Sequence, residues 1–122
     1  IQIENDEDLD EAGVRILAGM EAEAVLITRG NDGLVLYERD LSPYRLPVSV
    51  SQPWEIVDPT GAGDTVAAVF ALAISSGASM RQAAFLGNVA GGEVVRRLGA
   101  ATLSPPELVA AVEQCALPAP EN

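Results

Sequence analysis

The sequence contains no histidine and no lysine, and Cys115 is its only cysteine. A single cysteine cannot form an intrachain disulfide. Without histidine or clustered cysteines, the usual zinc sites and the histidine-based nucleophilic triads are excluded. The lack of lysine also excludes a Walker-type phosphate loop, which needs Gly-Lys before Ser or Thr. The chemistry left to this chain is that of carboxylates, hydroxyls, arginines and backbone groups.

Positive charge is also scarce, because seven arginines stand against 18 acidic residues and give a formal net charge of −11. This balance argues against binding to nucleic-acid phosphates or to an anionic membrane surface. No apolar run free of breakers reaches the roughly 18 residues of a membrane span, and no basic segment followed by an apolar one opens the chain. We therefore expect a cytoplasmic protein whose ligands are small molecules.

The chain has 122 residues, and 48% of them are hydrophobic. This length is near the common size of one domain, and the apolar content is too high for a disordered chain. We expect a single domain or part of one, since no low-complexity linker divides the chain and no internal repeat is apparent.

Apolar spacing and turn residues predict an alternation of strands and helices. Six of the eight residues from Glu4 to Glu11 are acidic, and we interpret them as the solvated start of the first helix. The expected helices cover Asp6–Met20, Gly61–Ser76, Met80–Leu98 and Pro105–Cys115, and the expected extended segments cover Ala24–Thr28, Leu34–Glu38, Tyr44–Val50, Glu55–Val57 and Ala100–Leu103.

Two of these elements bear on the fold class. The uninterrupted apolar run Ala24–Thr28 follows a helix, which favours a parallel α/β sheet. The loop Arg29–Gly33 contains Asn-Asp-Gly and is equally consistent with a simple hairpin turn. The segment Gly61–Ser76 is apolar on nearly every face, which predicts an interior helix packed tightly against Met80–Leu98 through small residues.

The segment Asp58–Thr65 reads DPTGAGDT and joins a predicted strand to a predicted helix. Amide groups at a helix start attract anions, and glycines let an oxyanion approach them. Asp64 could accept a proton from a hydroxyl nucleophile, so this pattern suits phosphoryl transfer. A tight turn with a helix-capping aspartate explains the same spacing. Spacing alone does not decide between the two.

This motif resembles the C-terminal signature of the ribokinase-like (PfkB) carbohydrate kinases. VLITRGNDGLVLYE resembles the strand and nucleotide-side hairpin of that family, and GNVAGGEVV with LGAATLSPPEL resembles the segments that close its ATP pocket. Within the family, VDPTGAGDTV and LGAATLSPPELVAAV are most similar to the kinase domain of bifunctional heptose 7-phosphate kinase/heptose 1-phosphate adenylyltransferases, which serve lipopolysaccharide synthesis. The resemblance implies a three-layer α/β/α fold whose central sheet is only partly contained in this chain.

The resemblance also implies a set of site residues. It makes Asp64 the catalytic general base and Gly61, Ala62 and Gly63 the anion hole for the transferring phosphoryl group. It places Thr28, Gly30, Gly33 and Asn88 on the nucleotide side, with Asn88 near the adenine. The implied ligands are ATP with Mg²⁺ and a sugar or sugar phosphate.

A monovalent cation such as K⁺ is a further expectation from the resemblance, with Asp58 and Thr60 beside its position and Ser104 as a weaker candidate. Two of the residues have simpler explanations. Asn88 could instead hydrogen-bond a nearby loop. Ser104, followed by Pro105 and Glu107, could instead be the N-cap of the last helix.

The resemblance covers nearly all of the chain but lacks the family's N-terminal sugar-binding strands and β lid. We therefore expect the catalytic, ATP-binding C-terminal portion of a sugar kinase, residues 1–122, which is nearly inactive alone. Two alternatives are a nucleotide-binding module without catalysis and an assembly module. In the second, the edge of a partial sheet would drive self-association.

Overall fold

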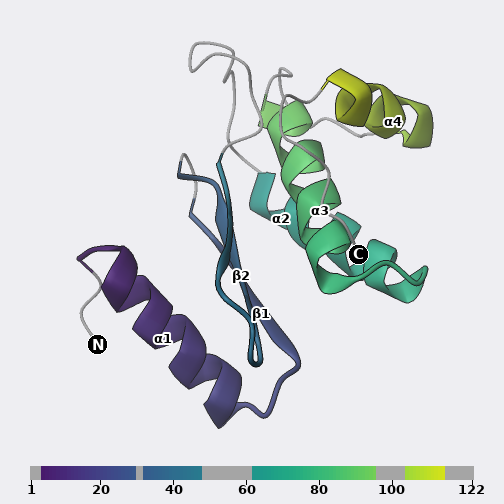
Figure 1. Cartoon of the computed structure of the whole chain (residues 1–122). Helices are drawn as coiled ribbons and strands as arrows, with labels where there is room; N and C mark the ends of the chain where they lie inside the picture. The colour runs from purple at the N-terminus through teal and green to yellow at the C-terminus, as the bar shows by residue number, and fades with distance from the viewer. Residues whose placement is uncertain (1–3, 30–31, 48–61, 96–103, 115–122) are drawn as a thin grey trace.

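The computed structural model describes residues 4–29, 32–47, 62–95 and 104–114. Its elements follow the order helix, three strands, three helices (Figure 1). They are α1 (Asp6–Gly19), β1 (Ala24–Thr28), β2 (Leu34–Glu38), β3 (Tyr44–Leu46), α2 (Ala62–Ser75), α3 (Met80–Val95) and α4 (Pro105–Gln114).

The described residues form three layers, with α1 on one face of the sheet and α2 and α3 on the other (Figure 1). Alternation along β2 creates this arrangement, because successive side chains of a strand point to opposite faces. Leu34 and Leu36 join the core formed with α2 and α3. Val35 and Tyr37 join the core formed with α1. The three-layer α/β/α expectation is confirmed.

The sheet has the order β1-β2-β3, and both pairings are antiparallel. The prediction that the first strand belongs to a parallel sheet is wrong for the described residues. Thr28 pairs with Leu34 across a short loop, whereas a parallel connection needs about a dozen residues or more. The continuous apolar character of β1 has another cause: Leu26 packs toward the α2 side, and Val25 packs toward the α1 side.

A polar cluster joins α1 to the sheet. The Tyr37 hydroxyl donates a 2.7 Å hydrogen bond to Asp10, and Arg45 pairs with the other oxygen of that carboxylate. Gly13 allows the close approach, since a β-carbon there would lie 2.5 Å from the Tyr37 ring. The interpretation of the acidic run as a solvated face therefore fails at Asp10, which binds across the interface.

The helices α2 and α3 form a tight pair joined by a short turn. Gly77 has φ +99°, which suits glycine. Ser79 then caps α3: its hydroxyl accepts from the Gln82 amide at 3.1 Å, while its own amide donates to the Gln82 side chain at 3.0 Å. A β-carbon on Gly87 would lie 3.0 Å from the Val66 carbonyl oxygen, so the expected close packing is confirmed.

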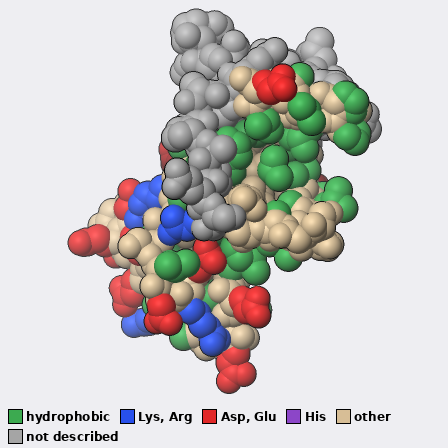
Figure 2. Space-filling view, turned by 45° about the vertical axis from the view of Figure 1, so that its right-hand side comes forward, with side chains coloured by type: hydrophobic (Ala, Val, Ile, Leu, Met, Phe, Trp, Pro, Cys, Tyr) green, Lys and Arg blue, Asp and Glu red, His purple; other side chains and the backbone are tan. Residues whose placement is uncertain are grey.

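The prediction that α2 is an interior helix is wrong in this chain. Val66 is buried against α3, but Leu72 is 68% exposed and the alanines at 67, 68 and 71 are also exposed. Hydrophobic side chains gather over this side of the molecule, whereas charged side chains gather over α1 and the hairpin (Figure 2). The sequence marks α2 as apolar all round, and the described residues cover only one of its faces.

The expected segments Glu55–Val57 and Ala100–Leu103 lie outside the described residues, as do the end of the helix predicted to Leu98 and residues 48–50 of the third extended segment. No helix among the described residues is long and apolar enough to cross a membrane.

Candidate active site

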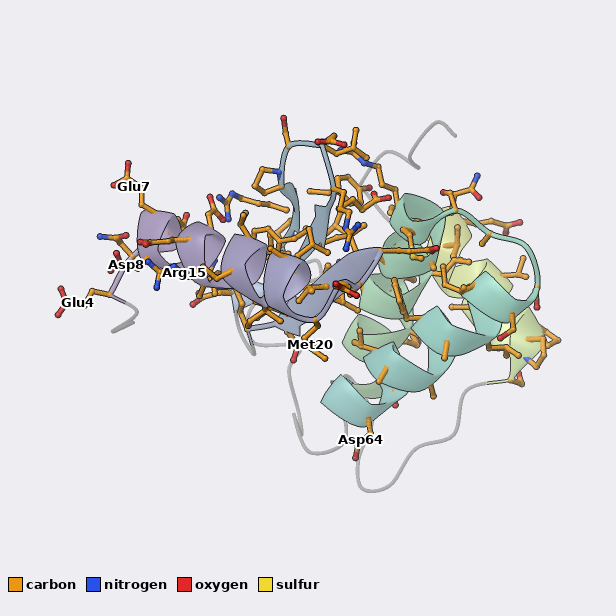
Figure 3. The ribbon with its side chains drawn as sticks, turned by 90° about the horizontal axis from the view of Figure 1, so that it is seen from below. Glu4, Glu7, Asp8, Arg15, Met20 and Asp64 are labelled. Carbon is orange, nitrogen blue, oxygen red and sulfur yellow. The ribbon has the colours of Figure 1, made fainter. Side chains whose placement is uncertain are left out.

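Asp64 lies in the first turn of the 14-residue helix α2. Its side chain is exposed and points away from the helix (Figure 3). The first amides of any helix lack intrahelical acceptors and carry the positive end of the helix dipole. Asp64 therefore combines a carboxylate open to a ligand with neighbouring backbone donors, which is the arrangement that proton abstraction beside a bound anion requires.

Gly63, just before Asp64, is exposed, and a β-carbon built on it would meet no atom of the described residues within 4 Å. The backbone at the start of α2 is consequently open on that side. Ala62 is the first residue of α2, and Gly61 precedes it outside the described residues.

Gly33 closes the β1-β2 hairpin with φ +86°. The Arg29 amide donates to the Gly33 carbonyl at 2.7 Å. A β-carbon on Gly33 would overlap the Leu46 carbonyl oxygen and lie 2.9 Å from the Pro47 carbonyl carbon. Turn geometry and backbone packing therefore require glycine here. The hairpin alternative for this loop is confirmed, and Thr28 is the exposed residue at the end of β1.

Asn88 is the one buried polar side chain among the described residues, at 6% exposed. Its side-chain amide donates a 2.8 Å hydrogen bond to the Pro47 carbonyl oxygen, 41 residues away in sequence. The structure thus confirms the simpler explanation of Asn88, a hydrogen bond from a helix to a loop. Its expected place near the adenine remains a prediction.

A series of contacts connects Gly33 with Asn88 and continues through Gly87 to α2. Gly33 packs on the backbone at Leu46 and Pro47, and Pro47 accepts from Asn88. Gly87, next to Asn88, contacts Val66. Val66 follows Asp64 by two positions on α2, so these contacts run from the hairpin to the first turns of α2.

Ser104 immediately precedes α4 and is half-buried, and its carbonyl accepts from the Leu108 amide at 3.0 Å. This position agrees with the helix-capping alternative. The helix α4 packs on the α3 side through Leu108 and Val112. Gly30, Asp58 and Thr60 lie outside the described residues, so the structure says nothing of their roles.

No group of three or more acidic, histidine or cysteine side chains suited to a metal ion occurs within the described residues. This finding does not conflict with Mg²⁺ bound through nucleotide phosphates, because Mg²⁺ commonly keeps several waters and takes only one or two protein carboxylates. Asp64 is the one carboxylate at the start of α2.

Sequence reasoning missed Pro47 as part of this region. Its carbonyl oxygen accepts the hydrogen bond of the buried Asn88 side chain. A backbone acceptor can belong to any residue type, so no sequence signal identifies it. The buried amide of Asn88 was the available clue, since such a group needs a partner.

Comparison with known proteins covers most of the chain. The family model for pfkB family carbohydrate kinases matches residues 1–107. Bifunctional protein HldE of Photorhabdus laumondii is 44% identical over 108 residues, which are 88% of this chain and 22% of that protein. The protein of the same name from Cronobacter sakazakii is 42% identical over 107 residues, with the same coverage. The chain thus spans about a fifth of the length of these curated relatives.

Solved structures agree with the fold. Arabidopsis thaliana ribokinase complexed with ribose and ATP superposes with a TM-score of 0.77 and 26% identity, covering 90% of this chain and 35% of that one. Thermotoga maritima ribokinase superposes with a TM-score of 0.75 and 26% identity, and the match covers 86% of this chain and 34% of that one. Escherichia coli phosphofructokinase-2 in complex with substrates and products superposes with a TM-score of 0.77 and 18% identity, over 95% of this chain and 36% of that one. At this identity the match supports the fold alone.

Proposed function

Because this chain belongs to the pfkB family carbohydrate kinases, we propose that it is the ATP-binding, catalytic C-terminal portion of a sugar kinase. The reaction is transfer of the γ-phosphoryl group of ATP to a hydroxyl of a sugar or sugar phosphate. The single observation that carries the proposal is the exposed Asp64 in the first turn of α2, inside the matched residues.

Asp64 acts as the general base that removes the proton of the attacking hydroxyl. The amides of Gly61, Ala62 and Gly63 stabilise charge on the phosphoryl group. The open surroundings of Gly63 support this role. Phosphoryl transfer depends mainly on positioning and charge stabilisation, so a carboxylate beside helix-terminal amides supplies what the protein must contribute.

ATP lies on the side of the hairpin loop, where Thr28, Gly30 and Gly33 approach it, with Asn88 on the adenine side. The contacts from Gly33 through Pro47 to Asn88 support a common nucleotide side for these residues. When bound, Mg²⁺ neutralises phosphate charge. Asp58 and Thr60, with Ser104 as a weaker candidate, would hold a monovalent cation such as K⁺.

The proposed acceptor is heptose 7-phosphate. The support is the resemblance of VDPTGAGDTV and LGAATLSPPELVAAV to the heptose kinase domain, together with 44% identity to a Bifunctional protein HldE. The chain spans 22% of that relative, and we propose that the acceptor-binding part belongs to the remainder of a longer protein. The 122 residues alone are then inactive or nearly so.

The test is Asp64→Asn in a full-length protein that contains this chain. The substitution keeps the shape and removes the base, so turnover should fall by about two to four orders of magnitude while ATP affinity stays within about threefold. Coupled kinase assays with heptose 7-phosphate, ribose and fructose 6-phosphate also rank the acceptors. Near-normal turnover of the variant contradicts the assignment of the base. Robust turnover by the 122 residues alone contradicts the division into two parts.

The second candidate is a module without catalysis, which binds a nucleotide or drives assembly. The exposed apolar face of α2, with Leu72 68% exposed, favours the assembly alternative. Calorimetric titration with ATP separates nucleotide binding from its absence, and light scattering measures self-association. Binding or association without turnover in the full-length protein would support this candidate over the kinase.

A further inference from the structure

Arg29 is the residue at which the β1-β2 loop closes. Its amide donates to the Gly33 carbonyl at 2.7 Å, and its own carbonyl accepts from the Asp32 amide at 3.1 Å. Both backbone groups of Arg29 are therefore used within the loop. The proposed nucleotide side includes Thr28 and Gly33, so a shift of the Arg29 backbone would disturb both hydrogen bonds that shape this loop.

The side chain of Arg29 leaves the loop and pairs with α1. Its Nη1 atom lies 3.2 Å from Oδ1 of Asp6, in the first turn of that helix. The Arg29 side chain is 27% exposed and that of Asp6 is 61% exposed. Because α1 and α2 cover opposite faces of the sheet (Figure 1), the ion pair directs the guanidinium toward the layer that does not carry Asp64.

The helix α1 gives this ion pair a fixed base. One turn after Asp6, Asp10 binds both the Tyr37 hydroxyl and Arg45. Gly13 lies so close to the Tyr37 ring that a β-carbon there would meet it at 2.5 Å. Residues four apart in a helix lie on the same side. The start of α1 is thus anchored on the sheet, and Asp6 is held where it meets the loop.

We propose that Arg29 and Asp6 are positioning residues, which tether the nucleotide-side loop to α1 and hold it in the conformation that receives ATP. This inference rests on the proposed kinase function. The Arg29 side chain acts through its own backbone, since Asp6 engages its guanidinium. Ion pairs of this exposure shift an equilibrium by about two- to fivefold and weaken in salt, so the expected effects are small but measurable.

The test compares Asp6→Asn with Glu11→Gln in a full-length protein that contains this chain. Both substitutions remove an acid of α1 from an arginine pair, but Glu11 pairs within the helix, with Arg15 at 3.0 Å. We expect KM for ATP to rise about threefold in Asp6→Asn, with kcat within about 1.5-fold, and to change by less than about 1.5-fold in Glu11→Gln. Asp6→Glu keeps the charge and should restore most of the affinity. In about 1 M salt the difference between wild type and Asp6→Asn should disappear.

A double-mutant cycle with Arg29→Gln separates tethering from direct contact with the ATP phosphates. If Arg29 acts through Asp6, then Arg29→Gln, Asp6→Asn and the double variant should raise KM by the same factor. If the guanidinium instead binds phosphate, loss of Asp6 leaves KM unchanged or lowers it, while loss of Arg29 raises it. That result overturns the inference, as do unchanged KM values in both variants or equal effects of Asp6→Asn and Glu11→Gln.

Hydrogen exchange without nucleotide gives a second readout. The peptide 26–36 contains the Arg29 and Asp32 amides, and it should exchange about threefold faster in Asp6→Asn and at the wild-type rate in Glu11→Gln. Unchanged exchange in Asp6→Asn overturns the tether. Failure of the proposed function looks different: if the wild-type protein neither binds nor turns over ATP, the kinase assignment fails. Faster exchange in Asp6→Asn alone would then still support the tether between the loop and α1.

Discussion

The Tyr37 hydroxyl and the Asp10 carboxylate meet at 2.7 Å across 27 positions of sequence. The phenol comes from β2 and the carboxylate from α1, so this hydrogen bond crosses the interface between two layers. Arg45 of β3 binds the second oxygen of the same carboxylate. The cluster thus connects three elements through one acid.

Removal of the Tyr37 hydroxyl should destabilise the folded chain. A hydrogen bond to a charged group contributes about 1.5–3 kcal/mol, so we expect Tyr37→Phe to lower the free energy of unfolding by about 2 kcal/mol. Tyr44→Phe is the control, because the Tyr44 hydroxyl makes no hydrogen bond within the described part of the chain and its ring keeps the Arg81 contact at 4.9 Å. Urea unfolding of both variants measures the difference, and equal losses would contradict a specific role for Asp10.

The same cluster predicts a dependence on alkaline pH. Burial, with the hydrogen bond to Asp10 and its charge, raises the pKa of Tyr37 from 10.0 to about 12. The folded state therefore favours the neutral phenol. The stabilisation that the neutral Tyr37 phenol gives the folded state is fully present below pH 10, the pKa of tyrosine in the unfolded chain. It is lost as the pH rises from 10 through 12.

Unfolding free energies of wild type and Tyr37→Phe measured between pH 9 and pH 12 test this dependence. The difference between the two proteins should shrink by about 2 kcal/mol over the upper two pH units. Subtraction of the variant removes the contribution of Tyr44, whose pKa is also raised by burial. A difference that stays constant up to pH 12 would show that Tyr37 ionises as easily in the folded state as in the unfolded one.

A comparison of Gly33 with Gly77 separates the effect of backbone conformation from the effect of close packing in the hairpin. Both have positive φ, at +86° and +99°, but only Gly33 lies against backbone atoms, those of Leu46 and Pro47. We expect Gly77→Ala to cost about 1 kcal/mol for its backbone conformation. Gly33→Ala should cost at least about 2 kcal/mol more, because strain and overlap add. Equal losses of stability in the two variants, measured by thermal unfolding, would show that the backbone around Gly33 shifts readily to accommodate a β-carbon.

The two faces of α2 should respond differently to truncation. In the 122-residue chain, Leu72→Ala is expected to cost less than about 0.5 kcal/mol because the side chain is already exposed, whereas Val66→Ala should cost about 1–3 kcal/mol. Denaturant unfolding measures both. A cost above about 2 kcal/mol for Leu72→Ala in a full-length protein would show that further chain covers this face there.

Much of the local structure was predictable from the sequence. The helix expected over 6–20 is observed over 6–19, and the strands at 24–28 and 34–38 have the expected bounds. These elements follow from local causes: an acidic first turn capped by Asn5 for the helix, and short apolar runs bounded by turn residues for the strands. Such signals lie within a few residues of one another.

The predictions that were wrong concern contacts between residues that are far apart in the sequence. The same apolar run fits a buried parallel strand or an antiparallel hairpin strand, and the short loop to Leu34 decided for the hairpin. An apolar helix such as α2 becomes interior only where other chain covers it. Asp10 stands in a run of acids in the sequence, and only the fold brings Tyr37 and Arg45 to its carboxylate.

The site was predictable in part. Asp64 and Gly63 are exposed at the start of α2, and their roles in catalysis stay predictions. The motif resemblance supplied their roles, because spacing alone did not exclude a tight turn with a helix-capping aspartate. The partner of Asn88 is a backbone carbonyl 41 residues away, and only the folded chain reveals it.

The strand β2 contributes side chains to both hydrophobic cores, Leu34 and Leu36 to one and Val35 and Tyr37 to the other. Loss of this strand would open both faces of the sheet at once, so neither layer of helices can melt while the other stays intact. The chain should therefore unfold as one cooperative unit, with the slowest-exchanging amides in β2 and a single transition reported equally by probes on α1 and α3.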